Sequence, residues 1–258
     1  MHHTTPHPRW SVPRGVLALV ALLSAGLVLA ACDEGSTAPG DRHELLGEAV
    51  TVGNGVARTF AVDSGGRIAS VGIELTEGAL AGLPSTMTEW MLPLPAGVQA
   101  APWDHATLDW NPQGHEPAAI YGLPHFDFHV YAISAGEQAA IQGGPDTTTV
   151  PAANVPKDYA SQVISVPRMG VHWADTLAAE FHGHPFDRTF IYGFYHGRLA
   201  FVEPMVTQAF LRSHPDVTAP VKQPGAFQVP GLYPASYSVR YDPGTRTLRV
   251  SLDSLVAR

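Results

Sequence analysis

The stretch Thr189-Phe-Ile-Tyr-Gly-Phe-Tyr-His-Gly-Arg-Leu-Ala-Phe-Val-Glu203 decides the fold class of this chain. Aromatic and β-branched residues fill both halves, and the central His196-Gly197 pair is typical of a two-residue hairpin turn. The stretch therefore predicts a long antiparallel β-hairpin. A regular register that starts at this turn places Phe190 opposite Glu203.

The same strand pattern recurs on both sides of this hairpin. Further strands are expected at residues 49–53, 57–63, 68–75, 125–133, 237–241 and 247–252. An Asn54-Gly55 pair marks a second hairpin turn. Residues 86–118 and 151–167 have little periodicity and predict long loops. The sequence therefore predicts one mainly β domain over residues 43–258, an antiparallel sandwich or barrel-like fold with long Pro/Gly-rich loops and a few short helices.

Composition supports a folded β domain and excludes other classes. The chain has 258 residues, 45% of them hydrophobic and 15% charged, which is enough apolar material for a core. Its 25 Gly and 23 Pro residues disfavour a bundle of long helices. The formal net charge is -8 and no basic run follows the N-terminal segment, so nucleic acid is not an expected partner.

The N-terminal segment has the pattern of a bacterial export signal. Arg9 and Arg14 precede an uncharged stretch that ends in Leu29-Ala-Ala-Cys32. This ending resembles the lipobox, in which the cysteine thiol takes a lipid such as palmitate after cleavage. We expect residues 1–31 to be a lipoprotein signal peptide and residues 32–42 to be the lipidated cysteine with a flexible spacer. An uncleaved helical anchor is the alternative.

Cys32 is the only cysteine, so the chain forms no intramolecular disulfide bond. We expect the domain to lie outside the cytoplasm in the bacterial cell envelope, tethered to a membrane through the lipid on Cys32. The choice between inner and outer membrane stays open.

The segment that follows Pro124 carries the chemistry. On a strand, alternate side chains share one face, so its aromatic and aliphatic residues point one way and its polar residues point the other. We call the polar set the polar row; it consists of His125, Asp127, His129 and Tyr131. Imidazole, carboxylate and phenol groups ligate metals or move protons, whereas Lys, Glu and Thr are more typical of a solvated face.

Spacing limits how these residues share an ion. Side chains two positions apart on a strand lie about 7 Å apart, so Asp127 can share an ion with His125 or His129. His172, near the end of another expected strand, and Glu203, on an apolar face, are expected to complete the ligand set. Residue types alone do not choose among zinc, iron, manganese and copper.

Other residues of the sequence are expected to support this site. His115 and Glu116 lie in the loop upstream of the strand, and together with Tyr131 they are expected to contact the ligands or a substrate. An activated water would support hydrolysis, and a redox metal would support oxygen chemistry; the sequence assigns no catalytic residue.

Two other interpretations stay open. The polar row is alternatively a structural hydrogen-bond network in a non-catalytic envelope protein that forms a homo-oligomer or binds a small ligand. The chain lacks a nucleophile elbow, a phosphate-binding Gly-rich loop and a His-Glu-x-x-His motif, whereas paired carboxylates for glycoside hydrolysis are not excluded.

Five motifs occur in the order Asp109–Pro117, Pro124–Tyr131, Met169–Trp173, Phe190–Gly193 and Phe201–Met205. Together they resemble an uncharacterised bacterial domain family whose known structural member is a thermophile protein from a sigma-E/anti-sigma-E regulon. The resemblance covers residues 68–211. It implies an exported or lipid-anchored, predominantly β domain that assembles as a homo-oligomer, and it implies no reaction.

Overall fold

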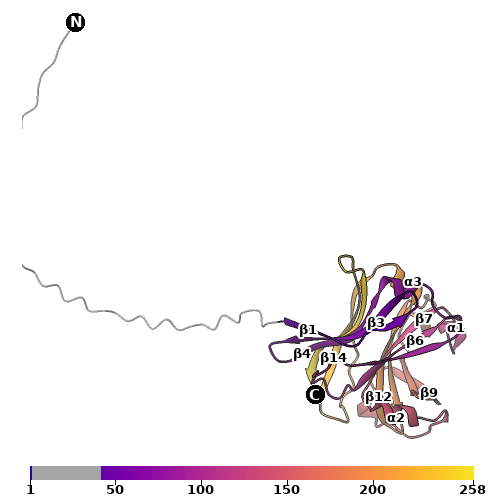
Figure 1. The fold of residues 1–258 in the computed structure, drawn as a ribbon. Coiled ribbons are helices and arrows are strands. Elements are labelled where there is room, and N and C mark those ends of the chain that lie inside the picture. The colour runs from indigo at the N-terminus through magenta and orange to yellow at the C-terminus, as the bar shows by residue number, and fades with distance from the viewer. Residues whose placement is uncertain (2–41) are drawn as a thin grey trace, which may run out of the picture. The chain divides into compact units, whose positions relative to one another are not determined.

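Two antiparallel β-sheets form the computed structural model, which describes Met1 and residues 42–258 (Figure 1). In spatial order the first sheet contains β1 (Arg42–Leu46), β3 (Gly55–Ser64), β4 (Ile68–Thr76), β15 (Thr247–Ala257), β14 (Leu232–Asp242) and β13 (Asp216–Pro220), with β2 (Val50–Val52) paired to β3. The second sheet contains β5 (Thr88–Pro93), β6 (His105–Asn111), β7 (His125–Tyr131), β12 (Arg198–Thr207), β11 (Arg188–Tyr195), β10 (Gly170–Asp175), β9 (Tyr159–Val166) and β8 (Gly144–Pro145). The mainly β, sandwich-like prediction is therefore confirmed, and within residues 42–258 neither sheet closes into a barrel.

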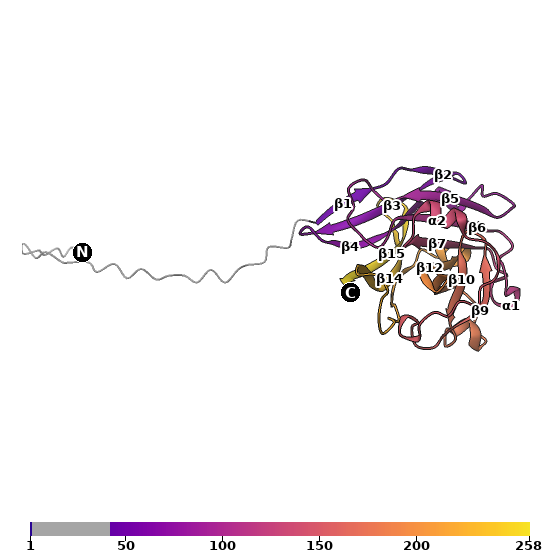
Figure 2. The same cartoon turned by 90° about the horizontal axis from the view of Figure 1, so that it is seen from below.

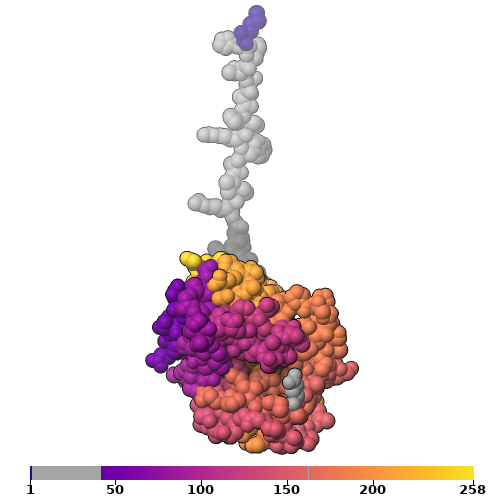
Figure 3. Space-filling model, turned by 90° about the vertical axis from the view of Figure 1, so that its right-hand side faces the viewer, coloured from indigo at the N-terminus to yellow at the C-terminus, as the bar shows by residue number. Residues whose placement is uncertain are grey.

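The chain begins and ends in the first sheet. Strands β1 to β4 come first, the middle of the chain builds the second sheet, and β13 to β15 return to the first. Thr76 of β4 pairs with Thr247 of β15, so the two ends of the described chain meet in one sheet. In Figure 3 the indigo N-terminal strands and the yellow C-terminal segment accordingly occupy the same end of the domain.

Helices are short and lie in the connections. They are α1 (Ala118–Tyr121), α2 (Ala135–Ala140), α3 (Gln208–Arg212) and the 3-10 turns η1 (Glu77–Leu80), η2 (Ala152–Asn154) and η3 (Ala179–His182). None of the helices within residues 42–258 has the length and apolar character that a membrane span needs. The expected signal peptide, Cys32 and most of the spacer lie outside the described residues.

The central strands of the second sheet are buried on both faces. Its inner face packs on the first sheet and forms the main core, with β7 contributing Phe126, Phe128 and Val130. A smaller apolar cluster, which includes Phe201 and Met205 of β12, lies on the outer face. Because both faces of the central strands are covered, polar side chains on the outer face are buried as well.

The second sheet curls, so that the strands near its two edges, β5 on one side and β9 on the other, approach each other (Figure 2). Arg168, in the turn between β9 and β10, forms an ion pair with Glu89 of β5, with 2.5 Å between Nη2 and Oε1. The backbone carbonyl of Arg168 also accepts a hydrogen bond from the hydroxyl of Tyr131 on β7. These contacts hold β9 and β10 over the outer face of β6 and β7.

Two predicted loops are wrong. The range 86–118 contains strands β5 and β6, and the range 151–167 contains strand β9. In β6, as in β7, polar residues alternate with apolar ones, and the residues on both faces are buried. Many prolines flank these strands, and proline is typical of loops, so the sequence pattern predicts a loop there.

The predicted long hairpin exists, but its register differs from the prediction. Ile191 faces Glu203, whereas Phe190 faces Pro204. A β-bulge opposite the Gly193–Phe194 step leaves Ala200 without a partner in the ladder and shifts the pairing by one residue.

Candidate metal centre and pocket

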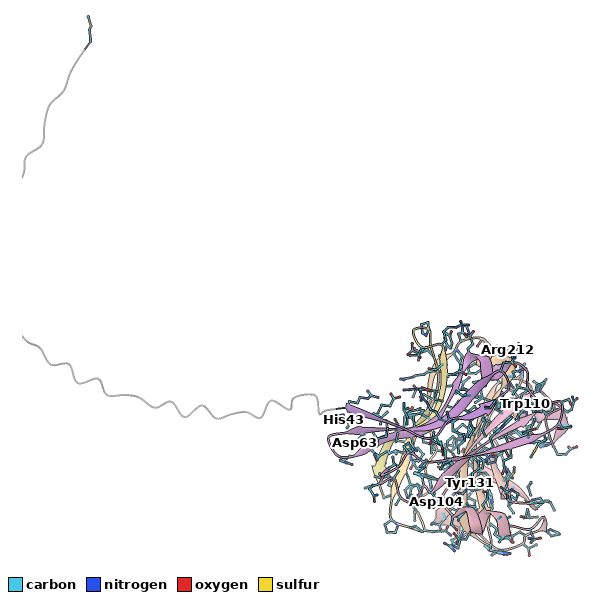
Figure 4. All side chains as sticks on the ribbon, viewed as in Figure 1. His43, Asp63, Asp104, Trp110, Tyr131 and Arg212 are labelled. Carbon is cyan, nitrogen blue, oxygen red and sulfur yellow. The ribbon has the colours of Figure 1, made fainter. Side chains whose placement is uncertain are left out.

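The polar row lies on the outer face of β7, the central strand between β6 and β12. Strands β6 and β7 pair with each other. Tyr131 of β7 is next to Asp104 at one end of this pair, and Trp110 of β6 is toward the other end (Figure 4). His125, Asp127, His129 and Tyr131 are all buried. The structure divides the predicted ligands into two groups rather than bringing them together as one site.

The first group consists of His115, His125 and Asp127. His125 and Asp127 are neighbours on β7, and His115 comes from the loop that precedes α1. The Nε2 atom of His125 lies 3.1 Å from Oδ1 of Asp127, and the Nε2 atom of His115 lies 3.6 Å from Oδ2. His115, which was expected to support the ligands, thus lies within reach of an ion shared with His125 and Asp127.

Backbone carbonyls fix how the two imidazoles of this group point. Nδ1 of His115 lies 2.8 Å from the carbonyl oxygen of Glu116, and Nδ1 of His125 lies 2.7 Å from that of Leu123. A carbonyl only accepts hydrogen bonds, so each Nδ1 carries its hydrogen. In the neutral imidazoles the lone pair is then on Nε2, and both Nε2 atoms face the carboxylate of Asp127.

The charge state of this group follows from its contacts. Burial alone would raise the pKa of Asp127, but hydrogen bonds and positive charge from the protonated rings of His115 and His125 outweigh it and hold that pKa well below its usual range. Burial lowers the pKa of His115, yet the contact with Asp127 raises it overall. Asn111 of β6 donates a hydrogen bond of 2.6 Å to Oδ2 of Asp127 and fixes the carboxylate plane.

The second group consists of His129, His172 and Glu203, from β7, β10 and β12. Oε1 of Glu203 lies 3.6 Å from Nε2 of His129, and Oε2 lies 3.5 Å from Nε2 of His172. His129 and Glu203 are fully buried, whereas the side chain of His172 is 27% exposed. Burial lowers the pKa of His129 to about 3 and that of His172 to about 4, so both rings are neutral at pH 7.

Asp109 of β6 lies beside the two groups and was not singled out from the sequence. It is fully buried directly opposite Asp127 in the sheet, and its Oδ2 lies 3.7 Å from Nδ1 of His129. The hydroxyl of Thr107 lies 3.4 Å from the same nitrogen. The alternation of Thr107 and Asp109 within residues 105–111 is the signal that would have found them, if this range had been interpreted as a strand.

Burial raises the pKa of both carboxyl groups beside His129. The pKa of Asp109 is well above its ordinary value because of burial and repulsion from Asp127. The pKa of Glu203 is raised for the same two reasons, with a further contribution from Asp109. Burial therefore favours the protonated forms of Asp109 and Glu203, whereas the contacts of Asp127 favour its ionised form.

Aromatic packing fixes the second group. The ring of Phe201 lies 4.8 Å from that of His129 and 5.2 Å from that of His172, measured between centroids. The ring occupies the space above Gly193, where a Cβ atom would come within 2.0 Å of it. Tyr131 stacks on His129 with 5.7 Å between ring centroids, and on its other partner, His105, with 4.8 Å.

Glu116 does not join either group. Its side chain is exposed, and its Oε2 accepts a hydrogen bond of 3.0 Å from the backbone nitrogen of Ala118 at the start of α1. It lines the pocket described next.

A pocket of about 660 Å³ opens beside the two groups. His115, Asp127 and His172 line it, together with Asn111. The first group therefore faces the pocket through two of its three members, and the second through His172. The arrangement defines a β-sandwich protein with two groups of two histidines and one carboxylate next to a ligand-sized cavity.

A protein-family model described as TTHB210-like, hypothetical protein TTHB210, matches residues 63–110. The chain is thus similar to an uncharacterised domain family over β4 to β6. The matched range includes Asp109 and contains no member of either group. No curated protein and no solved structure matches the chain.

Proposed function

We propose that this protein is a lipid-anchored envelope protein whose β-sandwich domain binds divalent transition-metal ions, one at each group of two histidines and one carboxylate. The observation that carries this proposal is a set of buried polar atoms with no hydrogen-bond partner among the described residues. These atoms are His129 Nε2 and Glu203 Oε2 in the second group, and in the first group His125 Nε2 and Asp127 Oδ1, which lack a partner when the imidazole of His125 is neutral with its hydrogen on Nδ1. Buried polar atoms are nearly always paired, so atoms of this kind that converge call for a cation between them.

The distances fit such a cation. Zinc binds imidazole nitrogen and carboxylate oxygen at about 2.0 to 2.2 Å, which puts neighbouring tetrahedral ligands roughly 3.4 Å apart. The nitrogen-to-oxygen distances in the two groups are 3.1, 3.6, 3.6 and 3.5 Å. In the first group the backbone contacts of each Nδ1 also leave the Nε2 lone pair directed at Asp127, as metal-binding histidines require.

A bound ion would supply Lewis acidity or redox chemistry beside the pocket. The residues of this chain would orient the reacting molecule there. Asn111 keeps the Asp127 carboxylate fixed, and His115 and His172 bring one imidazole of each group to the pocket lining. Zinc, iron, manganese and copper all suit this donor set.

Measuring the metal content of the purified protein tests the proposal directly. The full chain is purified in detergent without chelator or metal-affinity tag, and its metals are quantified by mass spectrometry. We expect about two ions per chain, one lost in His125→Ala and the other in His172→Ala. His214→Ala is the matched control, because His214 is exposed and stacks on Tyr241 away from both groups. A parent protein without stoichiometric metal would contradict the proposal.

The anchor is tested separately. The lipobox at Cys32 supports it, and this residue lies outside the described part of the chain. Labelled palmitate should be incorporated into the parent chain and not into Cys32→Ser. A chain that takes no label would contradict the lipid anchor and leave the metal sites untouched.

A further inference from the structure

The walls of the pocket are apolar and come from segments far apart in the sequence. Met87 precedes β5, Ile164 and Val166 belong to β9, Met169 lies in the turn before β10, and Met205 belongs to β12. The chain has 5 methionines, and three of them line this one pocket. Methionine side chains adapt to irregular apolar shapes, so these walls suit a hydrophobic body.

Large apolar side chains are exposed around the same pocket. Met87 is 54% exposed and Ile164 is 51% exposed, and Val166 and Phe181 are exposed as well. Each of these four residues lines the pocket. Apolar surface gathered at a cavity costs free energy in water and regains it when a ligand covers it.

The ionisable residues of the lining are unevenly distributed. His115, Glu116, Asp127 and His172 come from β7, β10 and the loop before α1. The segment before β5 and strand β9 contribute only uncharged lining residues. The charged and imidazole groups of the lining therefore come from one set of elements, and the wall formed by β9 and the segment before β5 carries none.

We propose that this pocket binds a small molecule with a hydrophobic body and a single oxygen-bearing end. The body lies among Met87, Ile164 and Val166, and the oxygen-bearing end points to His115 and His172. The cavity volume of about 660 Å³ is in the range of sites for small organic ligands. This inference rests on the proposed function only for the polar end, because the wall residues belong to neither metal group.

Two matched probes test this orientation on the full chain by calorimetric titration. One probe is 2-naphthoic acid, which has one carboxylate, and the other is naphthalene-2,6-dicarboxylic acid, which has the same body and a carboxylate at each end. We expect the first to bind at least tenfold more tightly, since the second carboxylate of the other probe would lie unpaired against the hydrophobic wall. Equal affinities would overturn the proposed orientation.

A wall variant tests the location. Ile164→Asp places a charge on the apolar wall and should weaken binding of 2-naphthoic acid at least tenfold. Val229→Asp is the matched control, because Val229 is 46% exposed but does not line the pocket. If Ile164→Asp binds the probe as the parent does, or changes only the oligomeric state, then the pocket is not the ligand site and the inference is wrong.

The same titration separates this inference from the metal proposal. Parent protein is compared before and after treatment with a chelator, with its metal content measured in parallel. If metal is bound but neither probe binds, the pocket inference fails and the metal sites stand. If no metal is found and 2-naphthoic acid still binds in a manner sensitive to Ile164→Asp, the pocket inference stands and the metal proposal fails.

Discussion

Asp109 and Asp127 face each other on neighbouring strands, yet their surroundings shift their pKa values in opposite directions. Asp127 has two imidazoles within 3.6 Å, and they lower its pKa although it is buried. The nearest imidazole nitrogen to Asp109 is 3.7 Å away, and burial raises the pKa of Asp109. Of the two, Asp127 is therefore the ionised carboxylate, which is the form that binds a cation.

A third carboxylate, Asp146, gives a prediction about stability. It accepts hydrogen bonds from the backbone nitrogens of Thr148 at 3.0 Å and His196 at 2.9 Å, and burial opposes the resulting lowering of its pKa only in part. Asp146→Asn should lower the free energy of unfolding at pH 7 by about 1 to 2 kcal/mol. Urea denaturation of both proteins measures this difference.

The pH dependence of that difference has a definite sign. Because the pKa of Asp146 is lower in the folded state than in the unfolded state, its contribution is present above the unfolded pKa of about 4. The contribution is lost as the pH falls through the folded pKa, so the two proteins should converge in acid. Asp216→Asn is the control, since the side chain of Asp216 is 83% exposed. A difference that stays constant between pH 7 and pH 3 would rule out the ionic contribution.

At the scale of elements, alternation, aromatic and β-branched residues and the turn pairs Asn54-Gly55 and His196-Gly197 were enough to predict β2, β3, β4, β7, β11, β12, β14 and β15. Strand β6 has the same alternation as β7, but the surrounding prolines and glycines led to its interpretation as a loop. The bulge at Ala200 was not predictable, because Gly193 and Ala200 fit an unbroken ladder equally well in sequence. Bulge and register depend on how Phe201 packs, which is a tertiary contact.

The packing of Phe201 against Gly193 of β11 allows the support of the second group to be tested by a substitution at Gly193. A methyl group at this position meets the ring of Phe201 at 2.0 Å, and Phe201 is fully buried against His129 and His172. Gly193→Ala should lower the free energy of unfolding by about 1 to 3 kcal/mol through overpacking. It should also reduce metal at the second group while the first group keeps its ion.

Gly136→Ala is the matched control for this substitution. Gly136 lies in α2, is exposed, and has no atom within 4 Å of an added Cβ. Alanine there should leave stability unchanged or raise it slightly, because alanine favours a helix. Chemical denaturation and metal quantification on both variants give the comparison. Equal behaviour of the two variants would show that Phe201 moves freely and does not fix the histidines.

At the scale of the whole molecule, the two faces of the second sheet differ in what they contact. Its inner face is filled by the first sheet and forms the main core, whereas its outer face carries the polar row and the pocket. The ion pair between Arg168, in the turn between β9 and β10, and Glu89 of β5 connects the two edges of this sheet across its outer face. The sequence predicted both faces of β7, but the curl brings together residues that lie far apart in the chain, and no local pattern encodes it.

Because the two groups draw on β7, β10, β12 and the loop before α1, bound metal should stabilise the domain against unfolding as a whole. An ion present at 100 times its dissociation constant adds about 2.7 kcal/mol. For a domain of this size that is a rise in Tm of roughly 5 to 10 °C. A chelator removes both ions from the parent and from His214→Ala, so it should lower their Tm by about twice this amount, and it should lower the Tm of His125→Ala, which keeps one ion, by about this amount. Scanning calorimetry provides the measurement, and a Tm of the parent that is the same with and without metal would contradict the binding of structural ions at the two groups.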